Sequence, residues 1–108
     1  EYFWLSIQEI ARILKFGGFV CIISPSAGFE HRYPVDCYRF YRDGMSAIAH
    51  FAGIKVLESK TNFEVSKSYT DGSHFWKDST LIGQKEKLSW KEQFLRKIHR
   101  KIARKIWA

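Results

Sequence analysis

Cysteine and proline are both scarce in this 108-residue chain, which has two of each. Cys21 and Cys37 form neither the paired framework of a small disulfide-rich domain nor a Cys-x-x-Cys metal motif. We therefore expect two free thiols, as in a reducing compartment. His50, His74 and His99 are scattered without the spacing of metal ligands, so no metal site is expected.

Long apolar runs are absent as well. No stretch approaches the roughly 20 residues of a membrane-spanning helix, and no signal peptide is visible, which favours a cytoplasmic protein. The chain opens at Glu1 rather than Met, and its first residues already fit a helix, so we expect a fragment of a longer protein. Its length suffices for one domain with a modest core.

Positive charge is concentrated at one end of the chain. Residues 1–84 contain nine Lys or Arg and nine Asp or Glu, whereas residues 85–108 contain nine Lys or Arg and two Glu. The whole net charge of +7 therefore belongs to the tail. Binding to nucleic acid or to an anionic membrane must be argued from those residues alone.

The pattern of apolar residues predicts a helix, a tight turn and a strand at the start of the chain. Residues 2–15 carry an apolar stripe at helical spacing, formed by Phe3, Ile7, Ile10, Ala11 and Leu14. Gly17 and Gly18 end this helix, since glycine adopts the left-handed conformation of a helix terminus cheaply. The continuous apolar run 19–23 predicts a strand buried on both faces, as in a parallel sheet.

Three more elements are predicted before the tail. A helix is expected over residues 44–52, with Asp43 as its cap. Strands are expected over residues 54–59 and 79–84, and residues 71–72, Asp-Gly, signal a turn between them.

Residues 88–107 predict a strongly amphipathic helix, because apolar residues recur at steps of three and four with basic residues between them. Three interpretations stay open. The helix could lie on a membrane with Lys and Arg toward anionic lipid, pack on the domain with a solvated charged face, or contact nucleic acid, which is the least favoured. Trp90 and Trp107 at its two ends favour an interface.

Residues 24–44 form the loop around which these elements are arranged. The loop follows a strand, precedes a helix, and contains both prolines with a dense run of Tyr, Phe, Arg and Asp. A loop of this length is usually functional or disordered, and this one is too aromatic for disorder. Ligands of α/β sheets bind beyond the carboxyl ends of strands, so this loop is the candidate site.

Two motifs resemble class I S-adenosylmethionine-dependent methyltransferases. Residues 9–18, EIARILKFGG, resemble the E-I-x-R-V-L-K-P-G-G turn before strand five of that family, with Phe16 where proline is usual. The H-x-x-P-x-D-x-x-R-F signature of a type 11-like subgroup is matched by His31, Pro34, Asp36, Arg39 and Phe40. Residues 52–56 are similar to the A-G-F-x-V stretch that leads into strand six.

The resemblance implies a fold and a separate role for each part of the protein. Residues 1–84 would be the C-terminal, substrate-side half of a Rossmann-like, seven-stranded, mainly parallel α/β sheet, and residues 85–108 a basic amphipathic helical tail. Residues 79–84 would run antiparallel between strands 19–23 and 54–59. The family binds S-adenosylmethionine through a glycine-rich turn and an acidic residue on its first strands, which this chain lacks. We therefore expect a missing N-terminal half to bind the cofactor, and the fragment alone to be inactive.

The position of the loop and the resemblance give its side chains candidate roles. His31 could be a general base toward an acceptor hydroxyl or amine, or it could brace the loop. Asp36 and Arg39 could form an ion pair that staples the loop, or Arg39 and Arg32 could grip an anionic substrate group. Tyr33 could wall the acceptor pocket or pack in the core.

The predicted function is methyl transfer from S-adenosylmethionine to a small-molecule or glycan-like acceptor, with Pro34 and Phe40 as structural residues and Phe40 in the core. The alternative is a non-catalytic, degenerate half-domain that binds a membrane or nucleic acid through its basic tail. Because the apolar strand 19–23 would leave a fragment with an open sheet edge, self-association is also expected.

Overall fold

The computed structural model describes residues 1–64 and 73–107, which form four helices and three strands. Along the chain these are α1 (Phe3–Ile13), β1 (Phe19–Pro25), α2 (Arg42–Ala52), β2 (Ile54–Thr61), α3 (Ser73–Trp76), β3 (Asp78–Lys85) and α4 (Trp90–Trp107). Every predicted helix and strand is present with slightly shifted bounds, and the short α3 is an addition. The predicted turn at residues 71–72 lies outside the described residues.

The three strands form one sheet in the order β1-β3-β2, and β3 runs antiparallel to both neighbours. Cys21 pairs with Ile82, and Ser59 pairs with Leu81. This confirms the predicted place of residues 79–84 between the other two strands. The predicted seven-stranded, mainly parallel sheet is wrong, because the described sheet has three strands and both adjacent pairs are antiparallel. A parallel pair would need β1 and β2 to be neighbours, and β3 occupies the position between them.

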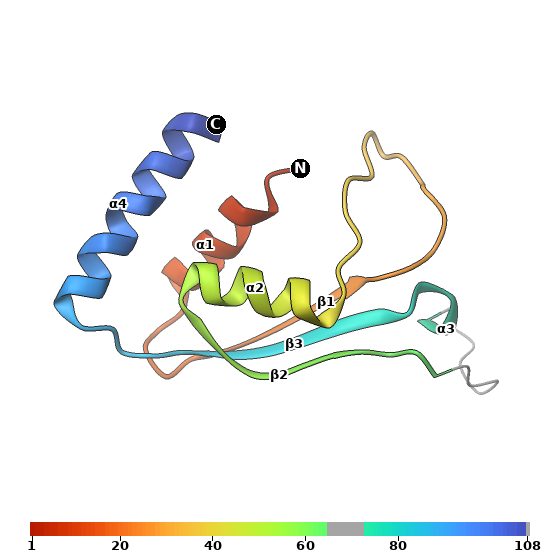
Figure 1. The fold of residues 1–108 in the computed structure, drawn as a ribbon, viewed down its shortest axis with the longest axis horizontal. Coiled ribbons are helices and arrows are strands. Elements are labelled where there is room, and N and C mark those ends of the chain that lie inside the picture. Colours follow the sequence, from red (N-terminus) through yellow and green to blue (C-terminus); the bar gives the residue numbers. More distant parts are fainter. Residues whose placement is uncertain (65–72, 108) are drawn as a thin grey trace.

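Helices α1 and α2 lie on the same face of the sheet, and no described element covers the opposite face (Figure 1). Side chains of β1 therefore alternate in burial, and Phe19 and Ile23 are 65% and 63% exposed. The prediction that the 19–23 run is buried on both faces is wrong for this reason. Its apolar outer side chains form an uncovered surface.

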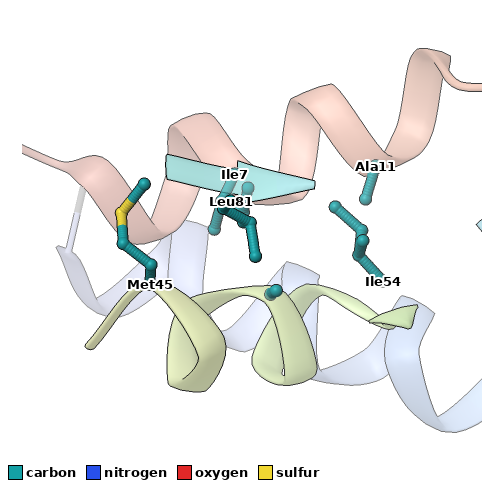
Figure 2. Close-up of a cluster of buried hydrophobic side chains, with 6 residues drawn as sticks. Ile7, Ala11, Met45, Ile54 and Leu81 are labelled. Carbon is teal, nitrogen blue, oxygen red and sulfur yellow. The ribbon is translucent and has the colours of Figure 1, made fainter. Parts of the chain in front are cut away.

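The core fills the space between the two helices and the sheet (Figure 2). Its buried apolar side chains come from α1, α2, β2 and β3, and they are Ile7, Ala11, Met45, Ala49, Ile54 and Leu81. Phe40, at the end of the long loop, packs against this cluster as predicted. The loop is therefore anchored to the core immediately before α2 begins.

Local sequence sets the helix ends, with two departures from the predictions. α1 ends at Ile13, so the helix stops before the two glycines that the pattern marks as its terminus. α2 begins at Arg42, which places Asp43 in its first turn rather than at its cap. α4 follows a capping box in which Glu92 Oε2 accepts the backbone N–H of Ser89 at 2.9 Å.

Candidate functional site

The loop between β1 and α2 is closed at its base by main-chain hydrogen bonds. The N–H groups of Ser26 and Ala27 both donate to the carbonyl of Trp76, at 3.2 and 2.9 Å. At the other end of the loop, the N–H of Phe40 donates to the carbonyl of Pro25 at 3.1 Å. The loop therefore leaves and returns at the carboxyl end of β1, next to α3.

Arg39 uses all five of its N–H groups inside the loop. Its two Nη atoms donate to the two carboxylate oxygens of Asp36, at 2.6 and 2.7 Å. The other donors reach the carbonyls of Ala27, Tyr38 and Phe29, at 3.2, 3.0 and 3.1 Å. The predicted ion pair that staples the loop is confirmed. No N–H of Arg39 is left for an anionic ligand in this conformation.

His31 shares the carboxylate of Asp36 with Arg39. The backbone N–H of His31 and its Nδ1 both lie 2.9 Å from Asp36 Oδ2. The bidentate Arg39, followed by the backbone N–H of His31, holds the pKa of Asp36 well below its usual range. Because an ionised carboxylate only accepts hydrogen bonds, Nδ1 must be the donor, and Nε2 of the neutral ring keeps its lone pair.

Aromatic side chains of the loop and of α3 lie beside the His31 ring. The ring centroid of His31 lies 5.2 Å from that of Trp76 and 6.4 Å from that of Phe29. Phe75 extends this surface, with its centroid 5.6 Å from Phe29. Arg39 lies over Trp76 at 6.0 Å, close enough for a cation–π contact. The structure thus adds three aromatic residues to the predicted site.

The sequence alone does not place Trp76 in this site, because a helix and a strand separate it from the loop. The signal that could have found it is the strand register. Pro25, the last residue of β1, pairs with Asp78, the first residue of β3. Residues just before β3 must therefore lie beside residues just after β1.

Arg32 and Tyr33 lie apart from this cluster. Arg32 Nε donates to Glu30 at 2.8 Å, and both of these side chains are exposed. Tyr33 is 94% exposed, so the alternative that it packs in the core is wrong. Pro34 follows Tyr33 through a cis peptide bond. Substrate-binding roles for Arg32 and Tyr33 stay predictions.

A shallow hollow of about 250 Å³ opens within the loop beside the Asp36–Arg39 pair. It is lined by Gly28, Glu30, Asp36, Cys37, Tyr38 and Arg39. His31 does not line it, so the structure brings His31 to the same carboxylate but not to the same hollow. Cys37 and Cys21 are both free thiols, as predicted, and both are exposed.

Two glycines near the ends of β1 differ in the space around them. Gly28 is the glycine that follows β1, and the space that a Cβ would occupy there is filled by the ring of Trp76 rather than left for a ligand. Gly17, which has open space around it, precedes β1. Within residues 1–64 and 73–107, no three His, Cys, Asp or Glu side chains gather in a way that could hold a metal ion.

Comparisons with protein-family models, with curated proteins and with solved structures gave no match. The strand order that the methyltransferase resemblance implies for residues 19–23, 54–59 and 79–84 is present. The family itself stays a prediction, carried by the motifs in residues 9–18 and 31–40.

Proposed function

We propose that this chain supplies the acceptor side of a methyl transfer from S-adenosylmethionine to a small-molecule or glycan-like acceptor. The observation that carries the proposal is the hydrogen-bonded row of Arg39, Asp36 and His31 at the carboxyl end of β1. The motif supplies these residue types, and the loop brings them within hydrogen-bonding distance of one another. A hydroxyl or amine is the acceptor group that such a row can activate.

His31 acts as the general base in this proposal. Its Nε2 takes the proton of the acceptor, which leaves the acceptor atom more nucleophilic. Asp36 accepts the Nδ1–H, fixes the tautomer and stabilises the imidazolium that forms. Arg39 is a positioning residue, because it holds Asp36 and does not touch the acceptor.

The aromatic side chains around His31 suit a small organic acceptor. Phe29 and Phe75 are 64% and 46% exposed, so their apolar faces are open to a ligand. Ligand sites usually combine such aromatic walls with a few polar groups that fix orientation. The Trp76 ring lies beside the His31 ring, with 5.2 Å between their centroids.

In this proposal the methyl donor is bound by a part of the protein outside residues 1–108, and the Trp76 ring that fills the space at Gly28 is consistent with that. The chain's own contribution is therefore restricted to the acceptor and its proton. The alternative function, a non-catalytic module that acts through its tail, predicts binding without turnover.

The test is release of S-adenosylhomocysteine by the full-length protein. It is incubated with S-adenosylmethionine and a panel of hydroxyl- and amine-bearing small molecules and glycans. Release that requires both protein and acceptor supports the proposal, and a reaction without acceptor measures background hydrolysis. If the protein shows no release with any acceptor, the non-catalytic alternative is favoured and the proposal is contradicted.

A further inference from the structure

Helix α4 meets the rest of the domain through its arginines. Arg104 donates to the carboxylate of Glu9 on α1, and the guanidinium of Arg96 lies against Gly53 at the end of α2. Arg100, one turn from each, is half-buried. Residues spaced by four share one side of a helix, so the side of α4 that contacts the domain is cationic.

Most of the apolar stripe of α4 lies on the side of the helix opposite these arginines. Ile98, Ile102 and Ile106 each follow one of the arginines by two residues, or about 200° around the helix. With Phe94 and Leu95, these side chains are 37–64% exposed. A helix of a globular domain normally turns its apolar stripe to the core. The exposed stripe of α4 instead has the character of an interaction surface.

An open groove extends this apolar surface from α4 onto α1 and α2, which lie next to it in Figure 1. The groove has a volume of about 670 Å³. It is lined by Phe3, Trp4, Ala47, Ile48, Phe51, His99 and Ile102. Ile102 belongs to both the stripe and the groove, so the two form one continuous apolar surface.

Exposed lysines occupy the other edge of the stripe. They are Lys91, Lys101 and Lys105. In helical projection these three fall among or beside the stripe residues, on the side away from the groove. Lys97 is also exposed, but it lies next to the arginines and lines a hollow with Arg96 and Arg100. Glu92 is the one acidic residue of the sequence 90–107. The apolar surface is therefore bordered by positive charge that points to solvent.

We propose that α4 binds the surface of an anionic lipid bilayer. The apolar stripe lies toward the acyl chains, and the lysines lie toward the lipid phosphates. Two arguments favour a bilayer over other partners. A second copy of the chain would bring two rows of lysines together, which repel each other. Nucleic acid would pair with the lysines but leave the isoleucine stripe uncovered. The contact is interfacial, because none of the helices in the described ranges is long and apolar enough to cross a membrane.

Co-flotation of the full chain with lipid vesicles tests the proposal. The vesicles contain phosphatidylcholine either alone or mixed with phosphatidylserine, at low and high salt. We expect binding to the mixed vesicles, loss of that binding at high salt, and little binding to phosphatidylcholine alone. Each lysine near the surface should raise the partition coefficient about fivefold, so the Lys101→Gln/Lys105→Gln variant should bind roughly 25-fold more weakly.

Two further variants separate this proposal from simple net charge. Lys55→Gln/Lys60→Gln removes the same charge from the uncovered face of the sheet, and it should bind as the wild type does. Ile98→Ser leaves the charge intact and should weaken binding. Equal binding to both vesicle types, equal loss in the two lysine variants, or binding to RNA but to neither vesicle would overturn the proposal. Failure of the wild type to float with mixed vesicles would overturn it as well.

Discussion

Arg39 and Asp36 are joined by two parallel hydrogen bonds, from both Nη atoms of the guanidinium to both oxygens of the carboxylate, at 2.6 and 2.7 Å. A bidentate pair of this kind fixes orientation as well as distance. Because Asp36 Oδ2 also accepts from His31, the position of the His31 ring depends on Arg39 through the shared carboxylate. The stability and association of the chain can be measured without a known substrate, beginning with the pH dependence of this pair.

Acid should weaken the loop through Asp36. Its pKa is lowered in the folded chain, chiefly by Arg39 and then by the backbone N–H of His31. The pair therefore stabilises the fold fully above the ordinary carboxyl pKa, and this stability is lost as pH falls from about 4 toward the lower folded-state value. We expect the wild type to melt at a higher temperature than Asp36→Asn near neutral pH, and the difference to shrink between about pH 5 and pH 2.

Differential scanning calorimetry across this pH range measures that difference. Asp43→Asn is the matched control, because Asp43 is exposed in the first turn of α2 and makes only a long contact of 3.7 Å with Arg42. Its melting temperature should stay close to that of the wild type. A difference between the wild type and Asp36→Asn that is the same at pH 6 and pH 3 contradicts the assignment.

Gly28→Ala should disturb the aromatic wall of the site. Gly17 and Gly28 both have left-handed backbone, with φ of +81° and +101°, but a Cβ overlaps the Trp76 ring only at Gly28 and has nothing within 4 Å at Gly17. We expect Gly17→Ala to cost on the order of 1 kcal/mol from backbone strain. Gly28→Ala should cost about 1–3 kcal/mol more, because Trp76 must move. Urea unfolding of the two variants measures this, and equal costs would show that Trp76 does not lie against Gly28.

Sequence periodicity located the helices and strands, but it could not show what covers each face. Residues 19–23 are apolar on both sides of the strand. That pattern is the same whether the second side of the strand is covered by a helix or is exposed, as it is at Phe19 and Ile23. Likewise, the spacing of α4 shows that it is amphipathic. Only the contacts of Arg96 and Arg104 show that its arginines face the domain.

The part of the candidate site that is formed by residues close in sequence was predictable. His31, Asp36 and Arg39 lie close in sequence, so a compact loop brings them within reach, and the Asp36–Arg39 pair follows from their spacing. The contact of His31 with Trp76 depends on the register of β1 with β3. Sequence patterns do not specify that register until the strand order is known.

The uncovered face and open edge of β1 should make the 108-residue chain self-associate. Phe19 and Ile23 project from this strand into solvent, and unpaired strand edges are templates for pairing. We expect Ile23→Lys to reduce association, because a charged side chain on an edge strand opposes pairing. Val35→Lys is the control, since Val35 is also exposed but lies in the loop. Sedimentation velocity that shows a wild-type monomer at every concentration would contradict this expectation.

The central claim, that His31 removes the acceptor proton, is tested most directly by the methyl-transfer rate of His31→Asn in the full-length protein. The rate is measured with an acceptor that the wild type uses, at saturating donor and acceptor, with the melting temperature recorded in parallel. The account predicts turnover roughly 10²–10⁴-fold below that of the wild type, with a nearly unchanged melting temperature, because His31 is half-exposed. Turnover equal to that of the wild type would contradict the account and leave His31 as a residue that only braces the loop.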